Sequence, residues 1–214
     1  MFDQLIWKEL QNLKGVLVLG LFFLIAPYGL VITNSFAEDS LPIAAFISMV
    51  ASQLTIVVLG ATVIGVERQN RSMEFLLGLP VSKSKVLLSK ALICLVVAAL
   101  IWGTFTLVVE LFVSADIRPD LRRIGLGAFL VGFVLFGIAW LCSILLKGLA
   151  IPITVSLAVT TAIVAAVGNY ASRQEWPIDE YGKNFYAIVF TIYAVVGAIS
   201  IIVGWVLFVR RCEP

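Results

Sequence analysis

Six long apolar runs constrain this chain more than any other feature of its sequence. A helix needs about 20 mostly apolar residues to cross the hydrocarbon core of a bilayer. Of the 214 residues, 61% are hydrophobic and 13% are charged, whereas a soluble domain is about 25% charged. This composition excludes a soluble fold, a coiled coil and a disordered chain, and it predicts an all-α integral membrane protein. The predicted spans are 15–33, 41–66, 91–113, 124–146, 149–170 and 187–209.

The basic residues indicate how these spans are oriented. If both termini lie in the cytoplasm, ten of the 15 Lys and Arg residues fall in inner segments and five in outer ones. This bias agrees with the positive-inside rule, although Arg118, Arg122 and Arg123 cluster on the outer side. We therefore expect a multi-pass protein of the cytoplasmic membrane with both termini inside. The inner basic residues are Lys8, Lys14, Arg68, Arg71, Lys83, Lys85, Lys90, Lys147, Arg210 and Arg211.

Residues 1–14 have an amphipathic pattern, with apolar side chains at near-helical spacing and most polar ones on the other face. This pattern predicts a helix in the inner interface, with Trp7 near headgroup depth. The alternative is a cytoplasmic extension of the first spanning helix. A cleaved signal peptide is disfavoured because the first apolar run exceeds the roughly 7–15 residues of a signal core.

One cytoplasmic loop, 67–90, is long and charged, and it contains the pattern of a short helix. Ser72 can cap the helix start, and Glu74 suits the positive end of the helix dipole. Gly78 can end the helix, and Pro80 forbids its continuation. A helix this short needs a docking surface, which is either the membrane or a groove on a cytoplasmic partner. Its apolar residues are Met73, Phe75, Leu76, Leu77 and Leu79.

This loop resembles the segment between the second and third spans of bacterial exporter permeases of the ABC transporter superfamily. These are short six-helix permeases whose ATPase is a separate chain. The matching strings are ER at 67–68, RSMEFLL at 71–77, LPVSK at 79–83 and then Lys90. This chain departs from the pattern at Arg71-Ser72, where many relatives have Gly-Ser or Gly-Thr. The departure concerns the residues at which the predicted short helix begins. The close match covers about 25 residues, while topology and span count extend it more loosely to the whole chain.

The resemblance implies that 67–90 holds a coupling helix gripped by a cytoplasmic ATP-binding subunit. It also implies pairing with a second permease copy or a related permease, because six spans are half of a twelve-span exporter. ATP-driven closure of the paired ATPases would then rock the membrane helices. The residues implied to contact the ATPase are Glu67, Arg71, Glu74, Phe75, Leu76 and Pro80.

The chain lacks the residues that would make it an enzyme. There is no phosphate-binding G-x-x-x-x-G-K-[ST] sequence, so we expect ATP and Mg²⁺ on the partner ATPase and no cofactor here. There is no histidine, and Cys94, Cys142 and Cys212 have no metal-binding spacing. We expect no catalytic residue, no metal and no nucleic-acid partner.

Five small residues, each four apart, form a ridge on the fifth predicted span. Such a ridge lets another helix approach closely. It predicts either packing within one bundle or a seam between two permeases, and the fifth span lies at that seam in similar exporters. The ridge residues are Ala150, Thr154, Ala158, Ala162 and Ala166.

Polar residues inside spans are costly and usually face protein or water. Gln53, Thr160 and Thr161 lie mid-span, and in related exporters the second and fifth spans help to line the path. We expect these three residues to line the translocation path, or Gln53 to make an interhelical hydrogen bond instead. Glu110, near the outer end of the third span, can reach headgroups or pair with one of the nearby arginines.

The outer segment 171–186 is rich in aromatic residues, which predicts either an outer gate or an interfacial belt. For the whole chain we expect the membrane subunit of an ATP-driven exporter in contact with membrane lipids. A six-span secondary transporter is disfavoured because it would need coupling carboxylates or broken helices at the midplane. A non-transporting membrane scaffold is the remaining alternative.

Overall fold

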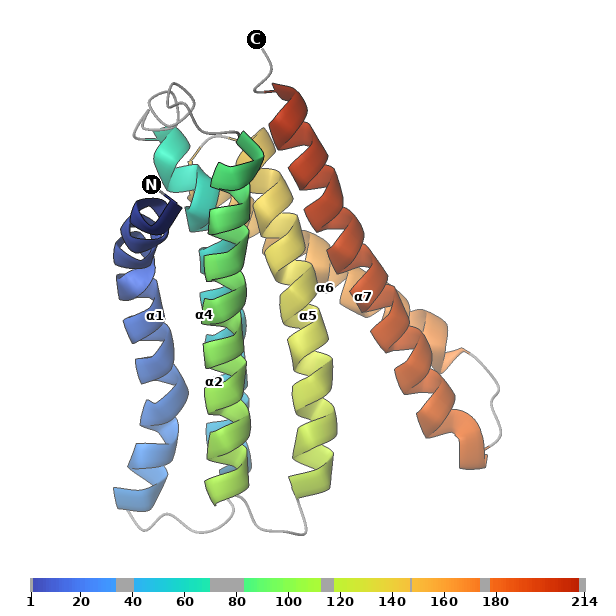
Figure 1. The fold of residues 1–214 in the computed structure, drawn as a ribbon. Coiled ribbons are helices and arrows are strands. Elements are labelled where there is room, and N and C mark those ends of the chain that lie inside the picture. The colour runs from blue at the N-terminus through green and yellow to red at the C-terminus, as the bar shows by residue number, and fades with distance from the viewer. Residues whose placement is uncertain are drawn as a thin grey trace.

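The structure is a computed structural model that describes residues 2–33, 41–69, 83–112, 118–146, 148–173 and 178–211. All regular elements in these ranges are helices (Figure 1). In hydrocarbon every backbone N–H and C=O must be bonded within the protein, and a helix does this within one segment. The helices are α1 (Phe2–Thr33), α2 (Leu41–Gln69), α4 (Lys83–Phe112), α5 (Arg118–Leu145), α6 (Ala150–Ser172) and α7 (Ile178–Arg211).

Five of these helices are long and apolar enough to cross a membrane, which confirms the predicted multi-pass helical protein. Their apolar segments are Ile43–Thr62, Ser84–Leu111, Gly125–Leu145, Ala150–Tyr170 and Ala187–Arg210. The apolar part of α1, Leu13–Gly29, is shorter. Figure 1 shows the N-terminus, the C-terminus and the α2 and α4 ends that flank residues 70–82 at the same end of the bundle.

The helices extend beyond the predicted spans, and this corrects the predicted loop 67–90. Helix α2 continues to Gln69 and α4 already begins at Lys83, so both ends of the predicted loop are helical. Similarly, α5 begins at Arg118 and α7 at Ile178. Hydropathy marks the part of a helix that lies in hydrocarbon, but backbone hydrogen bonding continues into the polar interface.

The helix ends follow local sequence signals. Pro42, Pro119 and Pro152 lie in the first turns of α2, α5 and α6, where no intrahelical N–H partner is lost. Between α5 and α6, Gly148 has a φ of 86°, a left-handed conformation that glycine adopts without strain. Helices α5 and α6 are therefore joined by a short connection, since α5 ends at Leu145 and α6 begins at Ala150.

Residues 2–33 form one continuous helix rather than separate interfacial and spanning helices. Figure 1 shows the dark-blue first turns of α1 almost end-on, whereas the following turns run along the bundle. The exposed fraction of Trp7 is 65% in this first part. A continuous helix agrees with the alternative in which the N-terminal residues extend the first spanning helix. The change of direction within α1 is the geometry that a segment lying in the interface requires.

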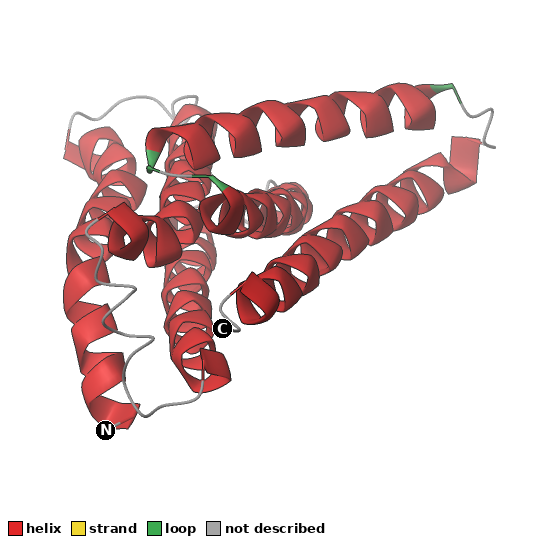
Figure 2. Cartoon of the chain, turned by 90° about the horizontal axis from the view of Figure 1, so that it is seen from above, coloured by secondary structure: helices red, strands yellow, loops and turns green. Residues whose placement is uncertain are grey.

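Helix α5 is the centre of the molecule and packs most extensively on α7 and α2. Of its apolar segment, 56% is buried, against 22% for α6 and 28% for α7. Figure 2 shows α6 and α7 leaving the bundle on one side as two inclined helices. The bundle thus consists of a packed part, α1, α2, α4 and α5, and two peripheral helices with large exposed faces.

Glycine allows the closest helix crossings. A Cβ at Gly137 of α5 would lie 2.7 Å from the carbonyl oxygen of Gly197 in α7. On α2, a Cβ at Gly60 would lie 3.0 Å from the carbonyl oxygen of Phe136. Small residues at membrane helix crossings let backbones approach closely enough for dispersion contacts to hold them. The α2–α5–α7 arrangement therefore depends on these glycines.

Candidate functional site

The predicted ATPase-contact residues lie at the end of the bundle that carries both termini. Glu67 belongs to the last turns of α2. Arg71, Glu74, Phe75, Leu76 and Pro80 lie outside the described residues. At the start of α4, Ser84 and Lys85 are exposed, whereas Lys90 is only 1% exposed. A lysine this deeply buried is rare unless paired, so the α4 start is tightly packed at this end.

Gln53 makes the interhelical hydrogen bond that was its alternative role. Its Nε2 atom donates to the carbonyl oxygen of Ala128, at 2.6 Å, and so joins α2 to α5. Its Oε1 atom is buried and has no hydrogen-bond partner among the described residues. The amide lies against Gly132, where a Cβ would be 2.9 Å from Oε1. The Nε2 atom of Gln53 therefore stabilises the α2–α5 contact, whereas the Oε1 atom remains an acceptor without a partner among the described residues.

The two threonines of α6 point in different directions. Thr160 is 3% exposed, and its Oγ1 has no hydrogen-bond partner in the described part of the chain. Thr161 is exposed, and its hydroxyl donates to the carbonyl oxygen of Leu157 at 2.8 Å. The structure thus separates two residues that are adjacent in sequence, because successive helix positions differ by about 100°.

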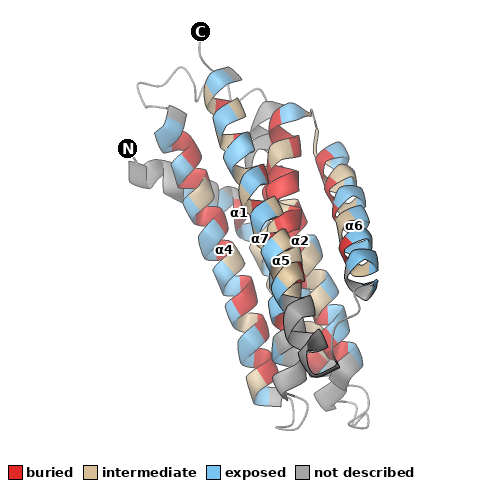
Figure 3. Cartoon of the chain, turned by 90° about the vertical axis from the view of Figure 1, so that its right-hand side faces the viewer, coloured by how far each residue is buried: buried red, intermediate tan, exposed pale blue. Residues whose placement is uncertain are grey.

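All five residues of the predicted ridge on α6 are exposed. Figure 3 shows α6 at the edge of the bundle with exposed residues along its length. The inward face of the same helix packs against α5 and includes Pro152, Ser156 and Val167. Packing of the ridge within this chain, the first of the two alternatives, does not occur among the described residues.

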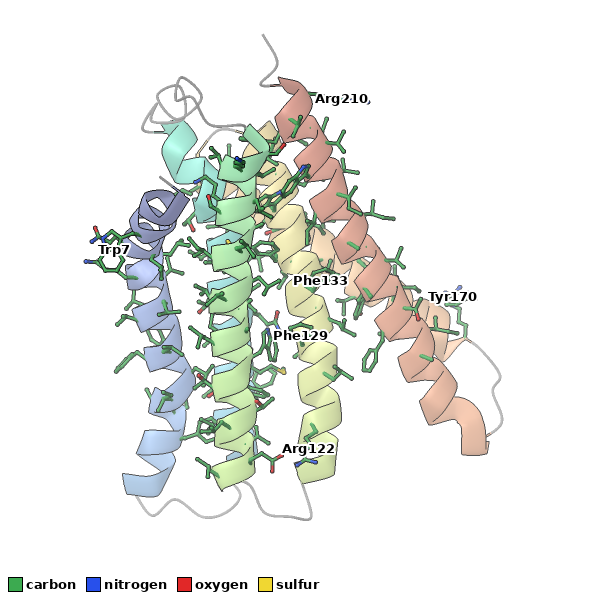
Figure 4. All side chains as sticks on the ribbon, in the orientation of Figure 1. Trp7, Arg122, Phe129, Phe133, Tyr170 and Arg210 are labelled. Carbon is green, nitrogen blue, oxygen red and sulfur yellow. The ribbon has the colours of Figure 1, made fainter. Side chains whose placement is uncertain are left out.

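Glu110 pairs with Arg122 at the ends of α4 and α5 that lie opposite the termini. The Arg122 Nε donates to Glu110 Oε1 at 2.6 Å, and Nη2 contacts the same oxygen. The arginine side chain is 63% exposed and the glutamate 38%, and Figure 4 labels Arg122 at the end of the bundle opposite the termini. One of the predicted partners of Glu110 is thereby identified.

Two cavities lie along α4 and α5, and neither was predicted from the sequence. An apolar cavity of about 460 Å³ lies between α4, α5 and α7, and Ile56 of α2 also lines it. A second, of about 300 Å³, lies between α4 and α5 toward the end opposite the termini and is lined by residues that include Glu110 and Arg122. The sequence feature that could have indicated the larger cavity is the spacing of aromatic residues on α5. These recur at helical intervals, at Phe129, Phe133, Phe136 and Trp140. These residues line the larger cavity.

The described residues contain no group of three or more His, Cys, Asp or Glu side chains that could hold a metal ion. Cys94 and Cys142 are buried cysteines inside helices. Buried cysteine commonly acts as a small apolar residue, and Cys94 is one of the residues that line the apolar cavity.

The fold and these surfaces define a class: a polytopic helical membrane protein with a short segment between α2 and α4 at the end that carries both termini. Residues 8–147, about two thirds of the chain, match the family described as ABC-2 family transporter protein. The chain belongs to this family and is the permease, the membrane subunit of an ABC transporter. No curated protein and no solved structure matches it significantly.

Family membership gives the general role of the subunit. ABC-2 permeases associate with ATP-binding subunits, are typically non-catalytic and generally lack cofactors. The match confirms the resemblance inferred from the loop 67–90. It includes that loop, α1 from residue 8 onward, and all of α2, α4 and α5, whereas α6 and α7 lie beyond it.

Proposed function

We propose that this permease is a six-span exporter subunit of the cytoplasmic membrane, with both termini inside, driven by a separate ATPase. The observation that carries this proposal is the family match over 8–147, because it includes the segment that resembles a coupling helix. ATP and Mg²⁺ bind to the partner chain. The apolar part of α1 forms the sixth span together with residues at its ends, and the first turns of α1 lie in the inner interface.

The coupling contact is made by Glu67, Arg71, Glu74, Phe75, Leu76 and Pro80. The charged side chains orient the contact, and the apolar ones enter a groove on the ATPase. Movement of this contact reaches the bundle through α2 and α4, which flank the segment directly. Since α2 is bonded to α5 through Gln53 and Ala128, a shift of α2 displaces the central helix.

The translocation path lies beside α2 and α6, with Gln53, Thr160 and Thr161 along it. Two of these residues support the proposal by keeping polar atoms without a protein partner among the described residues, namely Gln53 Oε1 and Thr160 Oγ1. Buried acceptors and hydroxyls of this kind are costly in hydrocarbon unless water or cargo satisfies them. The ridge on α6 supports pairing of two permeases next to the path.

The test is co-expression with the candidate ATP-binding partner chain from the same organism. A tag on the permease is expected to retain the ATPase through detergent extraction, and ATP turnover by the complex is expected to change when the permease is present. Permease that purifies without any ATPase, from cells that make both chains, would contradict the proposal. An ATPase carrying a mutated phosphate-binding lysine is the control, because it is expected to bind but not to turn over ATP.

The α6 seam is tested by the double change Ala158→Leu and Ala162→Leu. Larger side chains on the ridge keep the paired backbones apart, and a loss of about 1.4 kcal/mol corresponds to about tenfold weaker pairing. The measurement is the fraction of permease crosslinked as a dimer in native membranes. Ala187→Leu, at an exposed position of α7, is the control and is expected to crosslink like the wild type. Equal crosslinking by the double variant would exclude the ridge as the seam.

A further inference from the structure

The two cavities beside α4 and α5 adjoin each other. Both are lined by Trp102 and Phe129, whose rings pack edge to face with centroids 5.4 Å apart. Along α4 the lining runs from Ala91 to Glu110, and at 1.5 Å per residue this is about 28 Å. The hydrocarbon core of a bilayer is about 30 Å thick. The two cavities, which together we call the furrow, therefore lie one after the other along nearly the full apolar depth of the membrane.

The inner part of this furrow is apolar and aromatic. Its lining includes Ala98 on α4, Phe133 and Trp140 on α5, and Trp205 on α7. Empty cavities lined in this way do not hold ordered water, and the only abundant apolar solute at this depth is a lipid chain. The volume of about 460 Å³ lies within the roughly 300–1,000 Å³ of small-molecule sites. The shape and lining thus suit an acyl chain.

The outer part of the furrow ends at the ion pair between Glu110 and Arg122. A guanidinium has five N–H donors in a fork that matches phosphate, and Arg122 contacts Glu110 through Nε and Nη2. The arginine side chain is 63% exposed, so donors remain accessible at the interface. Figure 4 shows Arg122, Phe129 and Phe133 in succession along α5, from the outer end inward.

We propose that this furrow binds one glycerophospholipid of the outer leaflet. Its phosphate accepts hydrogen bonds from Arg122, and one acyl chain runs past Trp102 and Phe129 into the apolar cavity between α4, α5 and α7. A headgroup at Arg122 and a chain beneath it reproduce the order of polar and apolar groups found in that leaflet.

The lining of this lipid site shares no residue with the proposed path and seam, although Gln53 lies against the lining residue Gly132. None of the described residues that line the two cavities belongs to α6, and neither Gln53 nor Thr160 is among them. The site involves α4 and α7, which pack little on each other. A bound chain would fill the space between these two helices and transmit their movement, as a side chain does in a soluble core.

The test measures phospholipid retained by the purified full-length chain, by native mass spectrometry in detergent with added phosphatidylglycerol. The wild type is expected to retain one phospholipid per chain at low lipid concentration. Arg122→Gln removes the phosphate donor, and Ala98→Phe fills the cavity, so each is expected to weaken retention about tenfold. Ala99→Phe also fills the cavity, but it lies at an exposed lining position. It is therefore expected to weaken lipid retention while perturbing the fold less.

Two matched controls accompany these variants. Arg173→Gln removes an exposed arginine at the outer end of α6, and Val96→Phe enlarges an exposed α4 residue that does not line the furrow. Both are expected to retain lipid like the wild type. Glycerol phosphate, which carries the headgroup chemistry without a chain, is expected not to compete.

Three outcomes would overturn the proposal. Equal retention by all variants would show only the lipid annulus that surrounds any membrane protein. Loss with Arg122→Gln but not with the filling variants, or competition by glycerol phosphate, would show an anion site without an acyl chain. Loss with the filling variants but not with Arg122→Gln would show an apolar ligand that is not a phospholipid. The assay contains no ATPase, so its result is independent of the proposed coupling contact.

Discussion

Changing Phe75 and Leu76 together to aspartate is expected to abolish co-purification of this permease with its ATPase. Each apolar side chain that enters a protein groove contributes about 1.5–3 kcal/mol. Two lost side chains therefore weaken the contact by about a hundredfold to ten-thousandfold. Two carboxylates in the same groove add an unpaired-charge penalty. The measurement is the ATPase retained by tagged permease after detergent extraction.

Two control variants separate this effect from a general change in the loop. Phe75→Leu combined with Leu76→Met keeps the contact apolar and is expected to retain the ATPase. Ser84→Asp adds a negative charge at an exposed position near the start of α4, where it suits the helix dipole. Full ATPase retention by the double aspartate variant would show that the coupling helix does not lie at 73–79.

The second large effect is expected at Gly137, where α5 and α7 cross. A Cβ at this position would approach the Gly197 carbonyl oxygen to 2.7 Å and the Ser200 Cβ to 3.2 Å. A backbone oxygen cannot turn aside as a flexible side chain can, so the helices must separate. We expect Gly137→Leu to destabilise the fold by about 1–3 kcal/mol or more. A lower midpoint of thermal unfolding in detergent would measure this loss.

Gly103→Leu is the matched control for this prediction. Gly103 lies on α4, is exposed, and has no atom within 4 Å of a Cβ built on it. Leucine there is expected to be neutral or slightly stabilising, because it favours the helix by up to about 1 kcal/mol relative to glycine. Equal unfolding temperatures for Gly137→Leu and Gly103→Leu would contradict the close α5–α7 contact at Gly137.

Much of the membrane architecture was predictable from hydropathy and charge. Long apolar runs can only be helices in a bilayer, so the helical multi-pass fold followed directly from the sequence. The helix ends did not, because Glu67, Lys83 and Arg118 are polar yet helical. Hydropathy reports the surrounding solvent, whereas helix length depends on hydrogen bonds that continue through the interface.

The candidate site was predictable where the signal is local. The motif in 67–90 identified the family before any fold was known, and the family match confirms it. From the sequence, Gln53 and Glu110 each had two possible roles, because the role depends on which helix lies opposite the side chain. Only the fold brings Ala128 to Gln53 and Arg122 to Glu110.

The sequence by itself determined that this chain is a helical membrane permease of the ABC-2 family. Span length, charge placement and one short motif are properties of contiguous residues, so they can be read along the chain. The tertiary structure decided which faces are free: the α6 ridge is exposed, Gly137 meets Gly197, and a furrow runs beside α4 and α5. Helices that are apolar on every side carry little sequence signal for their partners, because lipid and protein interior are equally apolar.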